Sequence, residues 1–130
     1  MTLAADTKVW ARAYLNDDAK QAQRARAAIE AACGGEGIFV PLLVLAELFW
    51  VLDEEWERER VFDTLEQIFS TDGVVVESHT FAERALRESR AGGAGFADRL
   101  IAEVSFAEGV TEILTFDKVF GRLPRVRRLR

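Results

Sequence analysis

Short apolar segments with the composition of β-strands alternate along this chain with longer segments of helical pattern. Strands that alternate with helices favour a parallel sheet covered on both faces. With 130 residues, the chain is expected to form one domain over 1–130. Its predicted class is α/β, a three-layer α/β/α sandwich with a central, mostly parallel sheet. The predicted strands lie at 2–5, 37–40, 73–77, 112–116 and 125–129.

Helix-capping residues divide the segments between these strands. The polar residues at 16–18 can cap a helix that Gly34 stops, and Pro41 suits the first turn of the next one. A capping box at 80–83 begins another helix, and Gly109 closes the last. The predicted helices cover 7–14, 16–35, a segment that starts at Pro41, 57–70, a segment that starts at Thr80, and 95–109.

The composition is typical of a folded protein of the cytoplasm. The chain is 49% hydrophobic and 30% charged, which favours a globule over disorder. No signal peptide is recognised at its start, and the apolar run 42–52 is shorter than the roughly 20 residues that span a bilayer. Cys33 has no second cysteine for a disulfide and no partners for a zinc site, as expected in a reducing compartment.

Positive charge is concentrated at the carboxyl end of the chain. Five of the 17 basic residues are arginines within the last nine residues. The other 12 basic residues and all 22 acidic residues lie in 1–121, which therefore carries a net charge of −10. This arginine tail is either a solvated, edge-protecting segment or a contact for phosphates or for an acidic partner.

One carboxylate interrupts the most apolar segment of the chain. In Leu42–Leu52, ten of the eleven residues are apolar, and the exception is Glu47 at the middle. An ionised carboxylate alone in an apolar interior is costly. Glu47 therefore either lies on a narrow solvent-facing stripe of its helix or has its charge balanced by another group.

Three further acids fall at similar positions. Asp6 and Asp117 each end a predicted strand, and Asp98 lies near the start of an otherwise apolar helix. Each has a purely structural alternative: Asp6 can cap a helix, Asp98 can complement a helix dipole, and Asp117 can be a turn residue. Open α/β sheets bind ligands at the carboxyl ends of their strands, which favours a shared functional site.

Four converging carboxylates would repel one another unless a cation lay among them. All-oxygen ligands without His or Cys favour Mg²⁺ or Mn²⁺, and such a site can clamp a phosphodiester and activate water. Other chemistries lack their residues. His79 is the single histidine, there is no G-x-S-x-G elbow, and "GGAGF" lacks the Lys-Ser/Thr of a P-loop.

Four segments of the chain, in their order and spacing, form a pattern that is specific when they are taken together: "LAADTKVWARAYLNDD", "VPLLVLAELFWVL", "GFADRLIAEV" and "ILTFDKVFGRLPRVRRL". They resemble PIN-domain ribonucleases, specifically the VapC-type toxins of toxin–antitoxin pairs. The resemblance implies a metal-binding and catalytic cluster of four acids. By position in the motifs, these are Asp6, Glu47, Asp98 and Asp117.

The resemblance also implies Mg²⁺- or Mn²⁺-dependent cleavage of RNA, homodimerisation and inhibition by a VapB-type antitoxin. Thr115 is a candidate to hold a carboxylate or water of the cluster by its hydroxyl. The candidates for contact with the RNA backbone are Arg122, Arg125, Arg127 and Arg128.

Three positions depart from the family pattern. Lys8 stands where Asn or Ser is usual, and Gly95 and Val119 replace accessory acids. Lys8 could contact a phosphate or partly neutralise the acid cluster. These departures keep open a second interpretation, a non-catalytic PIN-like module that binds RNA or a protein. A third is a Mg²⁺-dependent phosphohydrolase of another α/β fold, because "DTK" at 6–8 resembles an aspartyl-phosphate motif, although the further residues of that chemistry are not found.

Overall fold

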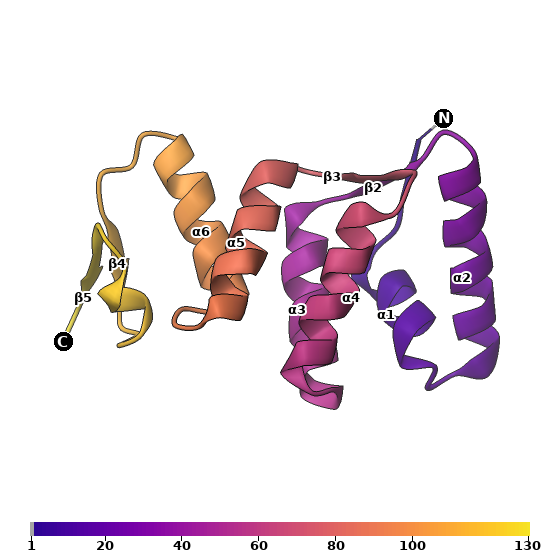
Figure 1. Cartoon of the computed structure of the whole chain (residues 1–130), viewed down its shortest axis with the longest axis horizontal. Coiled ribbons are helices and arrows are strands. Elements are labelled where there is room, and N and C mark those ends of the chain that lie inside the picture. The colour runs from indigo at the N-terminus through magenta and orange to yellow at the C-terminus, as the bar shows by residue number, and fades with distance from the viewer. Residues whose placement is uncertain (1) are drawn as a thin grey trace. The chain divides into compact units, whose positions relative to one another are not determined.

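The computed structural model describes residues 2–130, which fold into α-helices and short strands (Figure 1). The chain forms two compact units, one up to His79 and the other over Thr80–Arg130. We call them the N-terminal unit and the C-terminal unit. Over the described residues, no helix is both long enough and apolar enough to cross a membrane.

The N-terminal unit contains a three-stranded parallel sheet. The strand order is β1-β2-β3, and Ile38 pairs with Leu3 on one side and with Val74 on the other. The parallel pairing that the sequence predicts is therefore confirmed here. The elements of this unit are β1 (Leu3–Ala4), α1 (Thr7–Leu15), α2 (Ala19–Gly34), β2 (Ile38–Val40), α3 (Leu42–Glu55), α4 (Arg58–Ser70) and β3 (Val74–Val76).

Helix packing forms the core of the N-terminal unit. Helix α1 packs against both α2 and α3, and α3 packs against α4, as Figure 1 shows. Trp10 of α1 is 1% exposed, and Leu45 and Leu48 of α3 are fully buried. Burial of such large side chains contributes on the order of 2 kcal/mol each, so packing rather than helix propensity stabilises these helices.

The C-terminal unit contains a second, two-stranded parallel pair. Ile113 pairs with Val126 and Thr115 with Arg128, which confirms the predicted strand near the end of the chain. A small core of Ala94, Phe120 and Val126 supports this pair. The elements are α5 (His79–Ala91), α6 (Phe96–Ala107), β4 (Ile113–Thr115), the 3₁₀ helix η1 (Phe120–Arg122) and β5 (Val126–Arg128).

Most predicted helix boundaries agree with the structure. Asp18 caps α2 by accepting the Gln21 N–H at 3.1 Å, and α2 ends at Gly34. Gly109 follows α6 with a φ of +89°, a left-handed conformation that glycine adopts without strain.

Two predicted helix starts are shifted by one or two residues. Pro41 precedes α3 at the N-cap position rather than lying in its first turn. The capping box at 80–83 is wrong, because α5 already begins at His79 and Thr80 lies inside the helix. Ser78 has a φ of 46°, so a tight turn after β3 brings the chain into helical geometry before Thr80.

Candidate functional site

Asp6 connects the first strand to the first helix of the N-terminal unit. It follows β1 and is the N-cap of α1, where its Oδ1 accepts the Val9 N–H at 3.1 Å. The helix-capping role that the sequence offered as an alternative is therefore real. A cap of this kind engages one carboxylate oxygen and fixes the orientation of the side chain.

Glu47 lies on an exposed stripe of α3, not in the core. Leu43 and Trp50, one turn away on either side, are also exposed, at 70% and 69%, while Leu45 and Leu48 face the interior. The apolar run thus contains a solvent-facing stripe, which a count of apolar residues could not reveal. Because Glu47 is exposed, its charge carries no desolvation cost. Its position is explained instead by the residue that it contacts.

The Thr7 hydroxyl donates a hydrogen bond to Oε1 of Glu47 at 2.7 Å. Thr7 is the first residue of α1 and directly follows Asp6. The contact joins the start of α1 to the middle of α3, and so brings Glu47 next to the residue that follows Asp6. Sequence reasoning missed Thr7, although a hydroxyl adjacent to a candidate acid is a signal that could have drawn attention to it.

Asp98 and Asp117 form the second pair of candidate acids, and both lie in the C-terminal unit. Asp98 is in the first turn of α6. Partial burial raises the pKa of the Asp98 carboxyl, and the negative charge of Asp117 raises it further. Because like charges interact here, a cation beside Asp98 would stabilise its ionised form.

Backbone hydrogen bonds fix the turn that carries Asp117. Its Oδ1 accepts the Phe120 N–H at 2.7 Å, which ties it to η1. Its own N–H donates to Oγ1 of Thr115 at 3.0 Å. Thr115, a predicted supporting residue, therefore acts on the backbone of Asp117 by accepting this bond.

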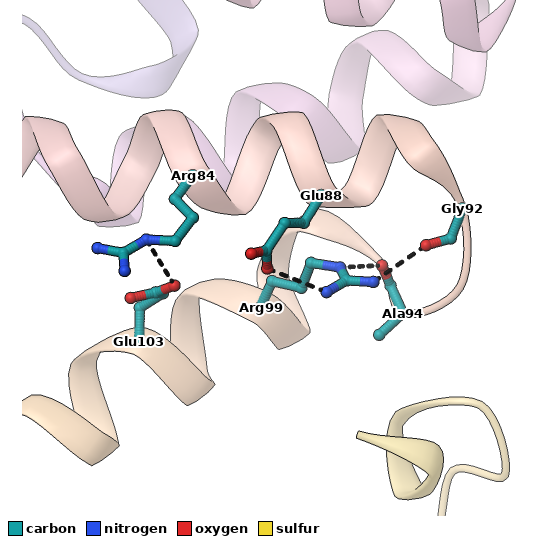
Figure 2. A network of polar contacts seen from close by, with 6 residues as sticks. All are labelled: Arg84, Glu88, Gly92, Ala94, Arg99 and Glu103. Carbon is teal, nitrogen blue, oxygen red and sulfur yellow. Dashed lines mark hydrogen bonds and ion pairs between the residues drawn. The ribbon is translucent and has the colours of Figure 1, made fainter. Parts of the chain in front are cut away.

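Arg99, the residue after Asp98 in the chain, anchors the loop before α6, and Figure 2 shows its contacts. Its Nε donates to the Ala94 carbonyl at 3.0 Å, one Nη to the Gly92 carbonyl at 3.0 Å, and the other to Glu88 of α5 at 3.2 Å. The Arg99 side chain is only 12% exposed.

A second contact between the same two helices joins Arg84 of α5 to Glu103 of α6 at 3.3 Å (Figure 2). Together these bonds fix the start of α6 and hence the position of Asp98. Sequence reasoning missed Arg99, whose signal is an arginine beside a candidate acid in an apolar helix.

The four candidate arginines of the tail differ in their contacts. The Arg125 guanidinium stacks over the Phe106 ring at 3.9 Å, and Arg127 on β5 pairs with Glu112 at 2.8 Å. Arg122 and Arg128 are exposed, and no described residue from 2 to 130 forms an ion pair with either. Arg122 and Arg128 are therefore better placed than Arg125 and Arg127 to contact an external phosphate.

The donor set fits a hard divalent cation. Asp6 and Glu47 lie in the N-terminal unit and Asp98 and Asp117 in the C-terminal unit, and carboxylate oxygens are ligands that suit Mg²⁺ or Mn²⁺. Over residues 2–130, neither unit by itself gathers three or more His, Cys, Asp or Glu side chains into a group that could hold a metal.

Comparison with known proteins identifies the family. The PIN domain model matches residues 4–126, a range that spans both units and contains all four candidate acids. The chain is also similar to a VapC ribonuclease of Aquifex aeolicus (strain VF5), with 30% identity over 91 residues. That alignment covers 68% of this chain and 67% of the relative. The helices and parallel strands of residues 2–130 agree with the α/β/α fold expected of such a domain. The chain therefore belongs to the PIN-domain family and is of the VapC type.

Proposed function

We propose that this protein is a Mg²⁺- or Mn²⁺-dependent endoribonuclease and the toxin of a toxin–antitoxin pair. The observation that carries the proposal is the presence of four acids, two in each unit, within the range that the family model matches. The similarity to a protein named VapC ribonuclease supports RNA as the substrate. With cellular RNA as its substrate, the protein would act in the cytoplasm.

In this proposal Asp6, Glu47, Asp98 and Asp117 hold the cation. A divalent cation bound by these carboxylates would supply Lewis-acid activation of water and of the phosphodiester. The chain's other residues position the ligands. The Thr7 hydroxyl orients the Glu47 carboxylate by the hydrogen bond described above.

Two further residues position the acids of the C-terminal unit. Thr115 fixes the turn of Asp117, and Arg99 fixes the start of the helix that carries Asp98. In the tail, Arg122 and Arg128 would bind RNA phosphates most directly. Arg125 and Arg127 would do so at the expense of their contacts with Phe106 and Glu112.

The proposed partners follow from the VapC type. A VapB-type antitoxin would inhibit the protein, and two copies of the chain would form a homodimer. Size-exclusion chromatography with light scattering tests the dimer. Growth arrest on expression of the chain alone, relieved by co-expression of the antitoxin, tests the toxin role.

The nuclease activity is tested with the full-length protein and a matched pair of variants. Glu47→Gln removes a proposed metal ligand on α3, whereas Glu54→Gln changes an exposed carboxylate on the same helix. We expect wild type and Glu54→Gln to cleave single-stranded RNA with Mn²⁺ or Mg²⁺ and not with EDTA. Glu47→Gln should lose at least about 100-fold in rate, because it loses a charged ligand.

The alternative function, a non-catalytic module that binds RNA, predicts a different result in the same assay. If wild type binds RNA but cleaves it with none of these metals, the protein is a non-catalytic RNA-binding module. Cleavage by Glu47→Gln at the wild-type rate would remove Glu47 from the proposed site.

A further inference from the structure

A cleft of about 410 Å³ lies between α1 and α2 of the N-terminal unit. These two helices pack side by side, as Figure 1 shows. Small residues of α2, Ala25 and Ala28, leave room along its wall. The residues that line the cleft are Asp6, Lys8, Val9, Arg12, Gln21, Arg24, Ala25 and Ala28.

The charge of this cleft is opposite to that of the chain as a whole. Lys8, Arg12 and Arg24 line it, and Asp6 is the single acid among the lining residues. Lys8 and Arg12 are four residues apart on α1, a spacing that places them on one face of the helix. In a protein with a net charge of −5, such a local excess of cations marks a site for an anion.

The three cations differ in their pairing within the chain. Arg12 donates from one Nη to Asp17 at 2.6 Å, which orients its guanidinium. No carboxylate of residues 2–130 forms an ion pair with Lys8 or with Arg24, and both side chains are exposed. Two positive charges at the cleft thus lack an internal counter-ion, and an external anion would be attracted to them.

We infer that this cleft binds a backbone phosphate of RNA, beside the phosphodiester to be cleaved. The inference rests on the proposed function, because Asp6 is both a proposed metal ligand and a wall of the cleft. RNA carries a phosphate at every nucleotide, so a strand with one phosphate at Lys8 and Arg24 has its neighbouring phosphates close to Asp6. The guanidinium of Arg24 offers paired donors that suit phosphate oxygens.

An acidic peptide is the competing ligand, and it fits the cleft less well. Its carboxylates would meet the Asp6 carboxylate, and the peptide carries no bond that the proposed activity cleaves. An RNA strand, by contrast, would present the phosphodiester that is the substrate of the proposed activity. Lys8 stands at a position that departs from the family pattern, so the phosphate site would be a property of this chain.

The test measures binding of a labelled single-stranded RNA of random sequence to the full-length protein by fluorescence anisotropy. EDTA is present, so that neither cleavage nor metal binding affects the result. Each phosphate contact contributes about 0.7 to the slope of log affinity against log salt concentration for a single strand. We expect Arg24→Gln and Lys8→Gln each to lower that slope by about 0.7 and the affinity by roughly fivefold.

Lys20→Gln is the matched control, because Lys20 is an exposed cation of α2 that does not line the cleft. It should leave both the slope and the affinity near wild type. Circular dichroism melts of all variants verify that each is folded. An Arg24→Gln slope equal to that of Lys20→Gln would overturn the inference, as would tighter binding of a polyglutamate peptide of equal charge.

Failure of the proposed function is a separate result. If wild type cleaves no RNA with Mn²⁺ yet loses RNA affinity through Lys8→Gln and Arg24→Gln, the phosphate site stands and catalysis fails. If cleavage occurs and neither variant changes binding, catalysis stands and the phosphate site fails. If wild type does not bind RNA at all, both are overturned.

Discussion

The two units each contain one pair of candidate acids, but they hold these pairs in different ways. In the N-terminal unit, Glu47 is exposed and its carboxylate accepts a hydrogen bond from Thr7. In the C-terminal unit, Asp98 is partly buried and its pKa is raised by burial and by Asp117. Glu47 thus accepts a hydrogen bond from a hydroxyl, whereas Asp98 is partly desolvated and is affected by the negative charge of Asp117.

Because of this difference, a bound cation would affect the two pairs of acids unequally. A hydrogen bond to a carboxylate stabilises its charged form without any metal, whereas burial beside a second carboxylate opposes that form. The C-terminal pair should therefore gain more from a divalent cation than the N-terminal pair.

Asp98→Asn should have the largest effect on activity. The change keeps the shape of the side chain and removes one charge, so the metal-free protein should be as stable as wild type or more stable, by up to about 1 kcal/mol. Metal binding should weaken, the metal-induced rise in Tm should shrink, and RNA cleavage should fall by orders of magnitude. Thermal melts with and without Mn²⁺ and a cleavage assay measure these effects. A destabilised but fully active variant would show that Asp98 only complements its helix dipole.

Arg99→Met should have the largest effect on stability. It removes the donors to the Gly92 and Ala94 carbonyls, and Glu88 loses the guanidinium with which it forms an ion pair. Because the side chain is largely buried, we expect a loss of about 2 kcal/mol in the free energy of unfolding.

The control is Arg87→Met, at an exposed position of α5, which should change stability by less than about 0.5 kcal/mol. Urea denaturation of both variants measures the difference. Equal stability of the two would mean that the loop before α6 does not depend on Arg99.

Thr7→Val tests the hydroxyl that distinguishes the N-terminal pair. It removes the donor to Glu47 and keeps the shape of the side chain, so the expected loss of stability is about 1 kcal/mol or less. Thr7→Val should also bind Mn²⁺ more weakly than wild type. Thr7→Ser keeps the hydroxyl and should bind Mn²⁺ as wild type does, as measured by isothermal titration. If Thr7→Val and Thr7→Ser bind Mn²⁺ equally well, the hydrogen bond does not prepare Glu47 for metal.

The arginine tail of the C-terminal unit offers a matched comparison of RNA contacts. Arg128→Gln removes a cation that forms no ion pair with any residue from 2 to 130, and should lower the salt slope of RNA binding by about 0.7. Arg127→Gln should lower it less, because Glu112 already engages the Arg127 charge at 2.8 Å. Equal, unchanged slopes for both variants would make the tail a solvated segment.

The pH dependence of stability gives the smallest expected effect. A raised pKa for Asp98 means that the folded protein holds this proton more tightly than the unfolded chain. Stability contributed by this group is therefore present at low pH and is lost as pH rises from the unfolded value, about 3.9, through the raised folded value.

Without metal, the stability difference between Asp98→Asn and wild type should grow in favour of the variant as pH rises to 7. Melts from pH 3.5 to pH 7 measure it. A difference that does not change with pH would show that Asp98 has no raised pKa in the folded protein.

Local sequence patterns predict most of the elements and the four candidate acids. The alternation of strands and helices, the Asp18 cap, the glycine after α6 and the strand at 126–128 all depend on neighbouring residues, and all agree with the structure. The family match over 4–126 agrees with the motifs that contain Asp6, Glu47, Asp98 and Asp117.

The contacts that these residues make, by contrast, are visible only in the folded chain. The bond from Thr7 to Glu47 spans 40 residues, and the stacking of Arg125 on Phe106 depends on the fold of the C-terminal unit. The cleft of Lys8 and Arg24 depends on how α1 lies against α2. Sequence periodicity gives the face on which a helical residue lies, but not the neighbour that this face meets. That choice is made by packing, through contacts between residues that are distant in the chain.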